Sequence, residues 1–362
     1  MKPKILIIGS TGKLGVKLLN FCKKNKINIF GITGFNNINL LNSQKKKYNL
    51  KNVFKLSDKY EIIRFKSFLK NFKIDIIYFL DYGYRSLIYA DIFLNNNRNS
   101  QIAIANKEMI IAGGDILIKK IFNTHNKLIP LDSEHFSLIN SVHKKDNIKK
   151  IYITASGGPF YFNKKINLNS VKLKNVLAHP KWKMGINNSI DSSNFINKIL
   201  EIYELSIIYK IDLKKIDFLV SQNAYIHSII LNNDGIININ CFDNDMIITL
   251  IYPLLNFYPT LNLPIKKNYL NNKSLRLEKF NDKRFKIKKY LTSLKNLSPQ
   301  KQITFMILNN IAQNKYLSEE IKYNEIVGFI MSNLNIIKKS HSLKSINERI
   351  KFIKKLESIY DY

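Results

Sequence analysis

Apolar runs and stretches of helical spacing alternate along the first 130 residues of the chain. The apolar runs, which are interpreted as strands, occupy residues 4–8, 27–32, 74–80, 102–105 and 127–131. Between them apolar residues recur three and four positions apart, as in Leu14, Leu18, Phe21 and Cys22, and this spacing predicts helices. Alternating strands and helices indicate a parallel sheet with helices on both of its faces.

After residue 131 the pattern predicts a second α/β region and then helices. Strands are predicted at 151–155, 216–220, 224–231 and 236–241, and helices at 194–209, 302–316 and 343–360. Residues 260–300 are basic and poor in structural signals, which indicates a connection. The pattern therefore predicts four segments, at residues 1–126, 127–258, 259–290 (the connection) and 291–362 (helical).

Three glycines, Gly9, Gly12 and Gly15, separate the first predicted strand from the first helix. Glycine lets the backbone approach a pyrophosphate closely, and the following helix N-terminus supplies N–H groups and a positive dipole. The strand before and the helix after this loop favour a dinucleotide site over a tight turn that binds no ligand.

The end of the second predicted strand bears on the choice of dinucleotide. Enzymes that use NAD place an acidic residue there for the ribose hydroxyl. Residues 31–37, GITGFNN, contain no Asp or Glu, which favours NADP. They also contain no Arg or Lys to hold its 2′-phosphate.

An acidic pair, Asp132 and Glu134, follows the strand predicted at 127–131. If the extended conformation continues, both side chains project from one face, and paired carboxylates suit Mg²⁺ or Mn²⁺. The alternative is an acidic helix N-terminus, because residues 133–142 have a helical pattern and acids stabilise that end. The spacing leaves both interpretations open.

A second polar group surrounds the start of the helix predicted at 194–209. Asp191 and Ser192 precede it, and Asn197, Lys198 and Glu201 lie in its first turns. A helix entry with Ser, Asn and Lys suits a phosphate, and Glu201 would add a third carboxylate. For an isolated helix, Ser192 as an N-cap and Glu201 as a solvated charge is the preferred alternative.

Two further loops carry unusual residues. The first is SGGP at residues 156–159, and the second is HPKWKMG at 179–185, which contains the only tryptophan, Trp182. An indole in a polar, glycine-flanked stretch favours a lid over a ligand, and packing of a loop onto the body is the alternative.

The composition indicates a soluble protein of a reducing compartment. Hydrophobic residues make up 45% of the 362 residues, but no apolar run approaches the ~20 residues needed to span a bilayer. Cys22 and Cys241 lack the spacing of a metal site or a disulfide, so we expect a cytoplasmic protein with no membrane partner. The formal net charge of +32 comes from lysines spread over the whole chain, which favours a solvated basic surface over a nucleic-acid site.

Taken together, the motifs resemble the 1-deoxy-D-xylulose 5-phosphate reductoisomerase family. In chain order they are GSTGKLG (9–15), ANKE (105–108), LDSEH (131–135), ASGGPF (155–160), HPKWKMG (179–185), IDSSNFINKILE (190–201) and IHS (226–228). The C-terminal third resembles the family more weakly, through LNNIAQN (308–314) and IKYNEI (321–326).

The resemblance implies an α/β fold with an N-terminal Rossmann-like NADP-binding domain (1–126), a central α/β catalytic and dimer-forming domain (127–258) and a C-terminal helical domain (291–362). It implies a homodimer that isomerises and reduces the sugar phosphate 1-deoxy-D-xylulose 5-phosphate to 2-C-methyl-D-erythritol 4-phosphate. NADPH and Mg²⁺ or Mn²⁺ are the implied cofactors.

The resemblance also assigns roles to residues. Asp132, Glu134 and Glu201 would bind the cation and, with Lys107, carry catalysis. The substrate would contact Ser133, Ser156, His179, Trp182, Met184, Ser192, Asn197 and Lys198, with Trp182 and Met184 on a mobile flap. NADPH would contact Gly9, Ser10, Thr11, Gly12, Lys13, Leu14, Gly34, Asn36, Asn106, Glu108 and Gly185.

Several positions depart from the family pattern. Ser221 stands where a histidine is usual, and Ile186 and Asn187 follow the flap in place of two basic residues. Phe35 occupies a place often held by a cation near the 2′-phosphate, and the loop at 81–85 keeps a single glycine, Gly83. These changes weaken cofactor binding or turnover more than the metal site, so we expect an active and slow enzyme.

Three other functions compete with this interpretation. A semialdehyde dehydrogenase needs a catalytic cysteine, and both cysteines here lie in apolar contexts. A basic nucleic-acid-binding protein would show steeply salt-dependent affinity and no turnover. A non-catalytic relative would bind the cofactor alone.

Overall fold

The computed structural model describes residues 2–142, 144–178, 185–263, 275–338, 341 and 343–360. The chain forms two compact units, which are treated separately below. The first unit comprises Met1–Ile139 and Asp243–Asn271, and the second unit comprises Asn140–Phe242 and Asn272–Tyr362. Within the described residues no helix is both long and apolar enough to span a membrane.

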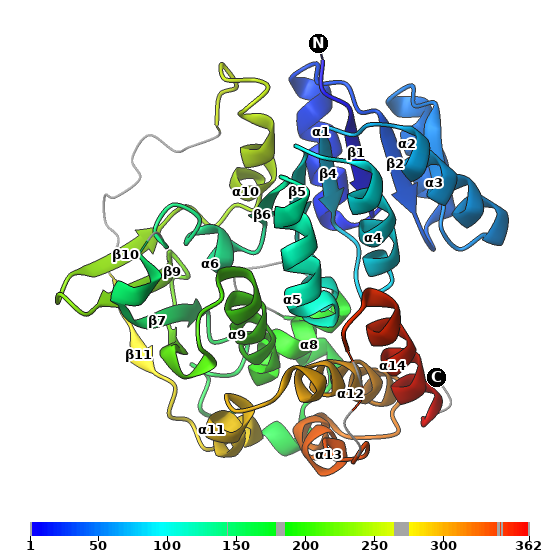
Figure 1. Ribbon diagram of the computed structural model, residues 1–362. Coiled ribbons are helices and arrows are strands. Elements are labelled where there is room, and N and C mark those ends of the chain that lie inside the picture. Colours follow the sequence, from blue (N-terminus) through cyan, green and yellow to red (C-terminus); the bar gives the residue numbers. More distant parts are fainter. Residues whose placement is uncertain are drawn as a thin grey trace. The chain divides into compact units, whose positions relative to one another are not determined.

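The first unit contains a six-stranded parallel sheet in the order β3-β2-β1-β4-β5-β6 (Figure 1). Its strands are β1 (Ile5–Ile8), β2 (Gly31–Gly34), β3 (Asn52–Lys55), β4 (Ile76–Phe79), β5 (Gln101–Ile104) and β6 (Lys127–Pro130). Its helices are α1 (Lys13–Lys24), α2 (Ile38–Lys47), α3 (Lys59–Asn71), α4 (Ser86–Asn96), α5 (Lys107–Asn123), α6 (Ser133–Phe136) and α10 (Ile247–Ile251). Strand order reverses between β1 and β4, where open α/β sheets bind ligands.

Helices cover both faces of this sheet, because its central strands are apolar on both sides. On one face Ile5, Ile7 and Tyr78 pack with Leu18 of α1 and Leu250 of α10. On the other, α3 contacts α4, and α4 contacts α5. The predicted parallel sheet with two helical layers is confirmed.

The second unit is built on a five-stranded mixed sheet in the order β10-β9-β7-β8-β11, in which β7 and β8 are parallel. Its strands are β7 (Ile148–Ala155), β8 (Ile216–Val220), β9 (Ile226–Asn232), β10 (Ile237–Cys241) and β11 (Glu278–Lys279). Its helices are α7 (Leu173–Leu177), α8 (Ile186–Asn194), α9 (Ile196–Tyr209), α11 (Leu291–Leu294), α12 (Pro299–Leu317), α13 (Ile326–Asn333) and α14 (Ile346–Ser358). The helices expected after residue 300 are present.

The structure divides the chain into two compact units, and the four segments expected from sequence stay a prediction. Strand β6 pairs with β5 in the first sheet, although residues 127–130 were assigned to the next segment. Residues 243–271 return to the first unit, where α10 buries Ile247, Leu250 and Ile251 in the same core as β1. Burial of apolar residues therefore sets the boundaries of the two units. The assignment of coenzyme-binding, catalytic and helical domains to ranges of the chain stays a prediction.

Several individual elements differ from the expected ranges. Strand β2 begins at Gly31, four residues late, because residues 27–30 lead into the sheet as a loop whose Phe30 N–H donates to Ile5 (2.8 Å). Strand β3 was not expected. The helix expected at 194–209 begins at Ile196, since Phe195 adopts a left-handed conformation (φ 67°) and separates it from α8.

Candidate active site

The glycine loop of the first unit forms a tight cradle between β1 and α1. Gly9 has φ +82°, and a Cβ there would lie 2.6 Å from the backbone nitrogen of Asp81. A Cβ on Gly15 would lie 2.5 Å from Cα of Ser10. Both positions therefore require glycine, because a side chain would strain or displace the loop.

Hydrogen bonds fix this loop to the end of β2. The Ser10 N–H donates to the Thr33 carbonyl (2.9 Å), and its hydroxyl donates to Oε1 of Gln44 (2.7 Å). The Ser10 side chain is therefore buried, and its hydrogen bonds to Thr33 and Gln44 fix the conformation of the glycine loop. Gly12 caps α1 without a side-chain hydrogen bond, and the first turn has no acidic residue. A backbone cradle at an uncapped helix N-terminus fits a pyrophosphate.

The remaining predicted cofactor contacts in this unit lie on neighbouring loops. A Cβ on Gly34 would lie 3.1 Å from Cγ2 of Thr11, so the end of β2 borders the glycine loop. Asn36 follows Gly34, and its carbonyl accepts from Ile38 (3.0 Å) at the start of α2. Lys13 is exposed on α1, whereas Leu14 packs against the core.

Asn106 caps α5 and ties it to the loop after β4. Its Oδ1 accepts from the Met109 N–H (2.9 Å), and its Nδ2 donates to the Gly83 carbonyl (2.8 Å) and to Oδ1 of Asp81 (3.3 Å). Lys107 and Glu108, the next two residues, are buried. Burial raises the pKa of Glu108, and the Lys107 ammonium opposes the rise.

Asp81, which is not among the residues predicted from sequence, joins this group. Burial raises the pKa of the Asp81 carboxyl to about 6, although hydrogen bonds from Ser86 and Asn106 oppose the rise. The Glu108 carboxylate raises it further. An aspartate directly after an apolar strand was the signal in the sequence that could have identified it.

We expect Asp81→Asn to stabilise the protein above about pH 6 and not at acidic pH. The folded state holds the Asp81 proton more tightly than the unfolded state, so stability falls as pH rises from about 4 to about 6. The variant, which cannot ionise there, should gain up to about 3 kcal/mol at pH ~8 and nothing at pH ~4, as measured by urea unfolding. Asp115→Asn, at an exposed position, is the control, and a gain independent of pH would contradict the prediction.

The acidic pair lies in a single helical turn at the end of β6. Asp132 is the N-cap of α6, and its Oδ1 accepts from the Glu134 N–H (3.1 Å). The extended conformation considered for this pair is therefore wrong, and the helix N-terminus is right. Carboxylate oxygens of Asp132 and Glu134 nevertheless lie within 4.8 Å of each other, close enough to share a hard cation.

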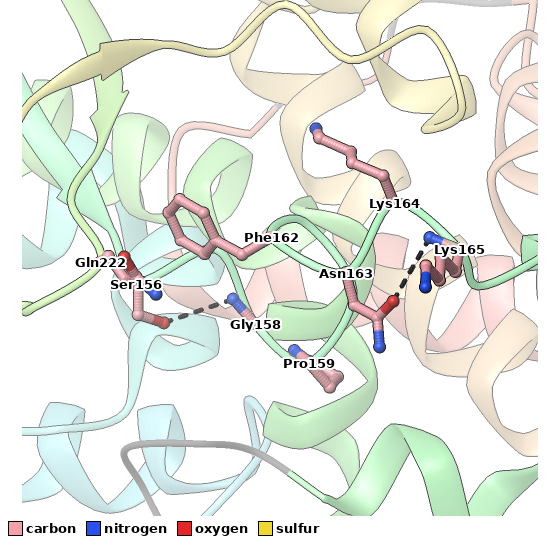
Figure 2. A pocket seen from close by; sticks show the side chains of 8 residues that line it. All are labelled: Ser156, Gly158, Pro159, Phe162, Asn163, Lys164, Lys165 and Gln222. Atoms are coloured by element: carbon pink, nitrogen blue, oxygen red, sulfur yellow. Dashed lines mark hydrogen bonds between the residues drawn. The ribbon is translucent and has the colours of Figure 1, made fainter.

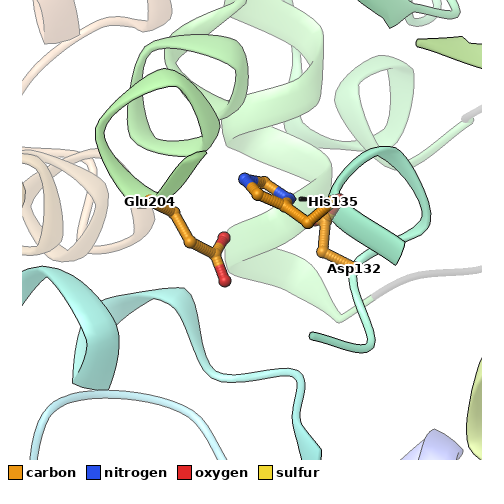
Figure 3. Close-up of side chains that lie close together, drawn as sticks. All are labelled: Asp132, His135 and Glu204. Carbon is orange, nitrogen blue, oxygen red and sulfur yellow. Dashed lines mark ion pairs between the residues drawn. The ribbon is translucent and has the colours of Figure 1, made fainter. Parts of the chain in front are cut away.

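Neighbouring side chains orient the two carboxylates. Nδ1 of the fully buried His135 lies 3.0 Å from Oδ1 of Asp132 (Figure 3). The Ser133 hydroxyl donates to Oε2 of Glu134 (2.5 Å). Ser133, predicted to contact substrate, is thus held beside the predicted metal ligands.

In the second unit, the predicted phosphate residues occupy two helices that meet at Phe195. Asp191 and Ser192 lie inside α8 and precede α9, as expected, whereas the alternative of Ser192 as an N-cap is wrong, because Phe195 is the N-cap of α9. Asn197, Lys198 and Glu201 lie in the first turns of α9, as expected. No Gly or Pro marks the break at Phe195, which is why the sequence predicted one helix.

Glu201 is the most enclosed of these groups. Its side chain is 2% exposed, so the alternative of a solvated charge is wrong. Nζ of Lys198 lies 2.5 Å from Oε2, and the Asn197 amide donates to the other carboxylate oxygen. The ammonium and the amide compensate the buried carboxylate and fix its orientation.

A network behind α8 holds Asp191. The Asn309 amide of α12 donates to both carboxylate oxygens (3.0 Å each), and the Gln313 amide donates to Oδ1 (2.5 Å). Asn309 and Gln313 belong to the LNNIAQN motif at 308–314. This part of the C-terminal helical segment therefore fixes the helix that carries Ser192.

The SGGP loop borders an open cavity of about 610 Å³ in the second unit (Figure 2). Ser156 lines it together with Gly158, Pro159, Phe162, Asn163, Lys164, Lys165 and Gln222. Gly157 and Gly158 have φ of +85° and +58°, which gives the tight turn at Ser156. Ser221, the position at which the resemblance implies a histidine, is buried, and its hydroxyl donates to Oδ1 of Asn223 (3.0 Å), while Gln222 lines the cavity.

His179, Trp182 and Met184 lie outside the described residues, so the predicted flap stays a prediction. Gly185 caps α8, and its position is exposed. The first unit thus contains the glycine loop and the acidic turn at Asp132, and the second unit contains the polar start of α9 with the buried Glu201.

Comparison with known proteins covers almost the whole chain. Family models for 1-deoxy-D-xylulose 5-phosphate reductoisomerase match residues 5–89, and for its C-terminal domain residues 128–209. The reductoisomerase of Pelagibacter ubique is 30% identical over 392 aligned residues, which cover 99% of this chain and 97% of the relative. That of Clostridium novyi is 30% identical, with 95% and 94% covered.

Solved structures share the fold. A crystal structure of DOX-P reductoisomerase in complex with NADPH, fosmidomycin and magnesium matches with a TM-score of 0.86 at 21% identity, covering 99% of this chain and 97% of that one. The Zymomonas mobilis reductoisomerase in complex with NADPH matches with 0.82 at 21% identity, covering 99% and 98%. By the identity of its relatives over nearly its full length, the chain belongs to the 1-deoxy-D-xylulose 5-phosphate reductoisomerase family.

Proposed function

We propose that the protein converts 1-deoxy-D-xylulose 5-phosphate to 2-C-methyl-D-erythritol 4-phosphate by isomerisation and NADPH-dependent reduction, in the non-mevalonate isoprenoid pathway. The observation that carries the proposal is 30% identity to a reductoisomerase over 99% of the chain. The relative solved with NADPH, fosmidomycin and magnesium supports the same cofactors here.

The first unit would bind the coenzyme. NADPH, when bound, supplies the hydride that reduces the aldehyde formed by rearrangement. The glycines let the backbone approach the pyrophosphate closely, and the N-terminus of α1, which has no side-chain cap, would face it, with the adenosine toward the end of β2. Asn106, fixed by Asp81 and Gly83, and Glu108 would line the same rim.

We propose that Asp132, Glu134 and Glu201 together bind Mg²⁺ or Mn²⁺. Such a cation, when bound, polarises the substrate's carbonyl and hydroxyl oxygens and stabilises negative charge in the rearrangement. The oxygen-only donor set, with Glu201 buried and Asp132 and Glu134 oriented by His135 and Ser133, fits a hard cation. Lys107 would contact the substrate near the reacting carbons.

The polar residues of the second unit would hold the substrate phosphate. Ser156 lines an open cavity, and Asn197 and Lys198 stand at the start of α9. Amide and ammonium donors of this kind bind phosphate strongly. Ser192 and His179 would complete the site, and the flap with Trp182 and Met184 would exclude water from the reactive aldehyde.

We also propose that the protein is a homodimer. The edge strand β10 exposes Ile237 (58%) and Ile239 (48%), and Ile236 just before it is also exposed (58%), whereas soluble proteins normally protect such edges. Ile237 and Ile239 point to one face of the strand. A second copy of this chain, which would bury the apolar edge, is the occupant that the family resemblance favours.

Replacing both Ile237 and Ile239 by Lys should convert the dimer to a monomer. Two charges on the strand would have to be desolvated in the interface, which we expect to lower the dimer affinity by at least about 100-fold. Multi-angle light scattering measures the mass. Ile63→Lys, at a position on α3 that is 67% exposed, is the control, and a variant that stays dimeric would contradict the assignment.

A cytoplasmic location is our proposal as well. Burial raises the pKa of the Cys22 thiol to about 12 and also raises that of Cys241, so neither thiol is set up for redox chemistry. Assay of the pathway activity in fractionated cells tests the location.

The experiment that tests the function follows the absorbance of reduced nicotinamide with substrate, NADPH and Mg²⁺ or Mn²⁺. Oxidation that depends on both the sugar phosphate and the cation is expected. Its absence would favour the alternative of a non-catalytic cofactor-binding relative. Salt-sensitive binding of DNA or RNA without turnover would favour the nucleic-acid alternative.

A further inference from the structure

The end of β2 lacks the charged side chain that normally distinguishes NADP from NAD. Residues Gly34, Phe35 and Asn36 occupy this position, and none of them carries a charge. An acidic residue there binds the ribose 2′-hydroxyl of NAD, and an arginine nearby accommodates the 2′-phosphate of NADP. The segment alone therefore gives no basis for a preference for NADPH.

Arg85 brings a cation to this position from another loop. It precedes α4 in the connection after β4, and its guanidinium carbon lies 5.4 Å from the centroid of the Phe35 ring. Arg85 is exposed, and Phe35 is 42% exposed. The stacked pair is therefore open to a ligand from solvent.

Sheet topology explains why these two loops meet. Strands β2 and β4 flank β1, so the segments after them lie on either side of the glycine loop. Gly9 packs against the backbone of Asp81 on the β4 side, and the Ser10 N–H bonds to Thr33 on the β2 side. Phe35 and Arg85 thus stand at the rim of the dinucleotide cradle within the first unit.

The contacts of Arg85 leave its guanidinium available. Arg64, which also stacks on a phenylalanine, pairs with the Glu61 carboxylate (2.6 Å). Among the described residues no carboxylate forms an ion pair with Arg85. Stacking on an aromatic ring fixes the guanidinium plane while its N–H groups remain able to grip a phosphate bidentately.

We propose that Arg85 recognises the 2′-phosphate of NADPH and sets the preference for NADPH over NADH. Phe35, in the place of the usual cation, would orient the guanidinium. The inference rests on the proposed function for the identity of the coenzyme. It explains how a chain without a charge at the end of β2 discriminates between the two dinucleotides.

The test is equilibrium binding of NADPH and NADH to the full-length protein, measured by titration calorimetry. Arg85→Ala should weaken NADPH binding about 10- to 100-fold and change NADH binding less than about twofold. Arg85→Lys keeps the positive charge but loses the bidentate guanidinium, so its NADPH affinity should lie between those of the parent and of Arg85→Ala. The loss of NADPH affinity in Arg85→Ala should be smaller at high salt concentration, because salt screens the charges.

Arg98→Ala is the matched control, because Arg98 is exposed in the same unit but precedes β5, at the opposite end of the strands. It should bind both coenzymes as the parent does. Unchanged NADPH binding in Arg85→Ala, or equal loss for NADPH and NADH, would overturn the assignment. A parent that distinguishes the coenzymes but fails to turn over the sugar phosphate would count against the proposed function alone.

Discussion

Glu201→Gln is expected to lower kcat/KM by about 10³-fold while the protein stays folded. The substitution keeps the size of the side chain and removes the negative charge that would bind the cation. Stabilisation of developing charge by a fixed cation contributes several kcal/mol to such reactions, so its loss is felt mainly in kcat. Steady-state kinetics over a range of Mg²⁺ and Mn²⁺ concentrations measure both the rate and the apparent metal affinity, which should also fall.

Glu320→Gln is the control for this variant. Glu320 also pairs with a lysine, Lys315 (2.6 Å), but lies exposed after α12. Its replacement should leave kcat/KM within about twofold, as is usual for surface charges. If Glu201→Gln is as active as the parent, or if Glu320→Gln loses as much activity as Glu201→Gln, the proposal that Glu201 binds the cation is wrong.

Asp191→Ala is expected to lower the free energy of unfolding by roughly 2–5 kcal/mol. The carboxylate accepts three hydrogen bonds from Asn309 and Gln313 in a region where all three residues are at most 2% exposed. Without it, two amides are buried with fewer acceptors, and each unsatisfied donor costs about 1–3 kcal/mol. The midpoint of urea unfolding, followed by circular dichroism, should fall accordingly.

Two other substitutions refine that experiment. Asp191→Asn keeps an oxygen acceptor and should lose less stability than Asp191→Ala. Asp146→Ala, at an exposed position before β7, should stay within about 0.5 kcal/mol of the parent. A midpoint for Asp191→Ala that matches that of Asp146→Ala would show that the network does not stabilise α8.

Sequence patterns predicted the elements whose apolar spacing is strong. Strand β1 and the glycine loop were evident because four buried apolar residues lead directly into glycines. Strand β3 was missed, since it has only four residues, of which Phe54 alone is buried. The break at Phe195 was missed because tertiary packing, and no local breaker residue, holds its left-handed conformation.

Some residues of the candidate site could likewise be predicted from sequence motifs, and others could be found only from the structure. Motif order selected Asp132, Glu134 and Glu201, but not the groups that orient them. Asp191 is held by Asn309, which lies 118 positions away along the chain, whereas His135 contacts Asp132 three positions before it. Arg85 and Phe35 are 50 positions apart, and only the placement of β2 and β4 beside β1 makes them neighbours. Spacing rules along the chain do not reach such pairs.

The return of residues 243–271 to the first unit has a consequence for biosynthesis. During translation the surface of β1 and α1 that later receives Leu250 and Leu254 leaves the ribosome long before α10 exists. At ordinary elongation rates the delay is on the order of ten seconds. We therefore expect a fragment that stops at Ile139 to expose this apolar surface and to aggregate.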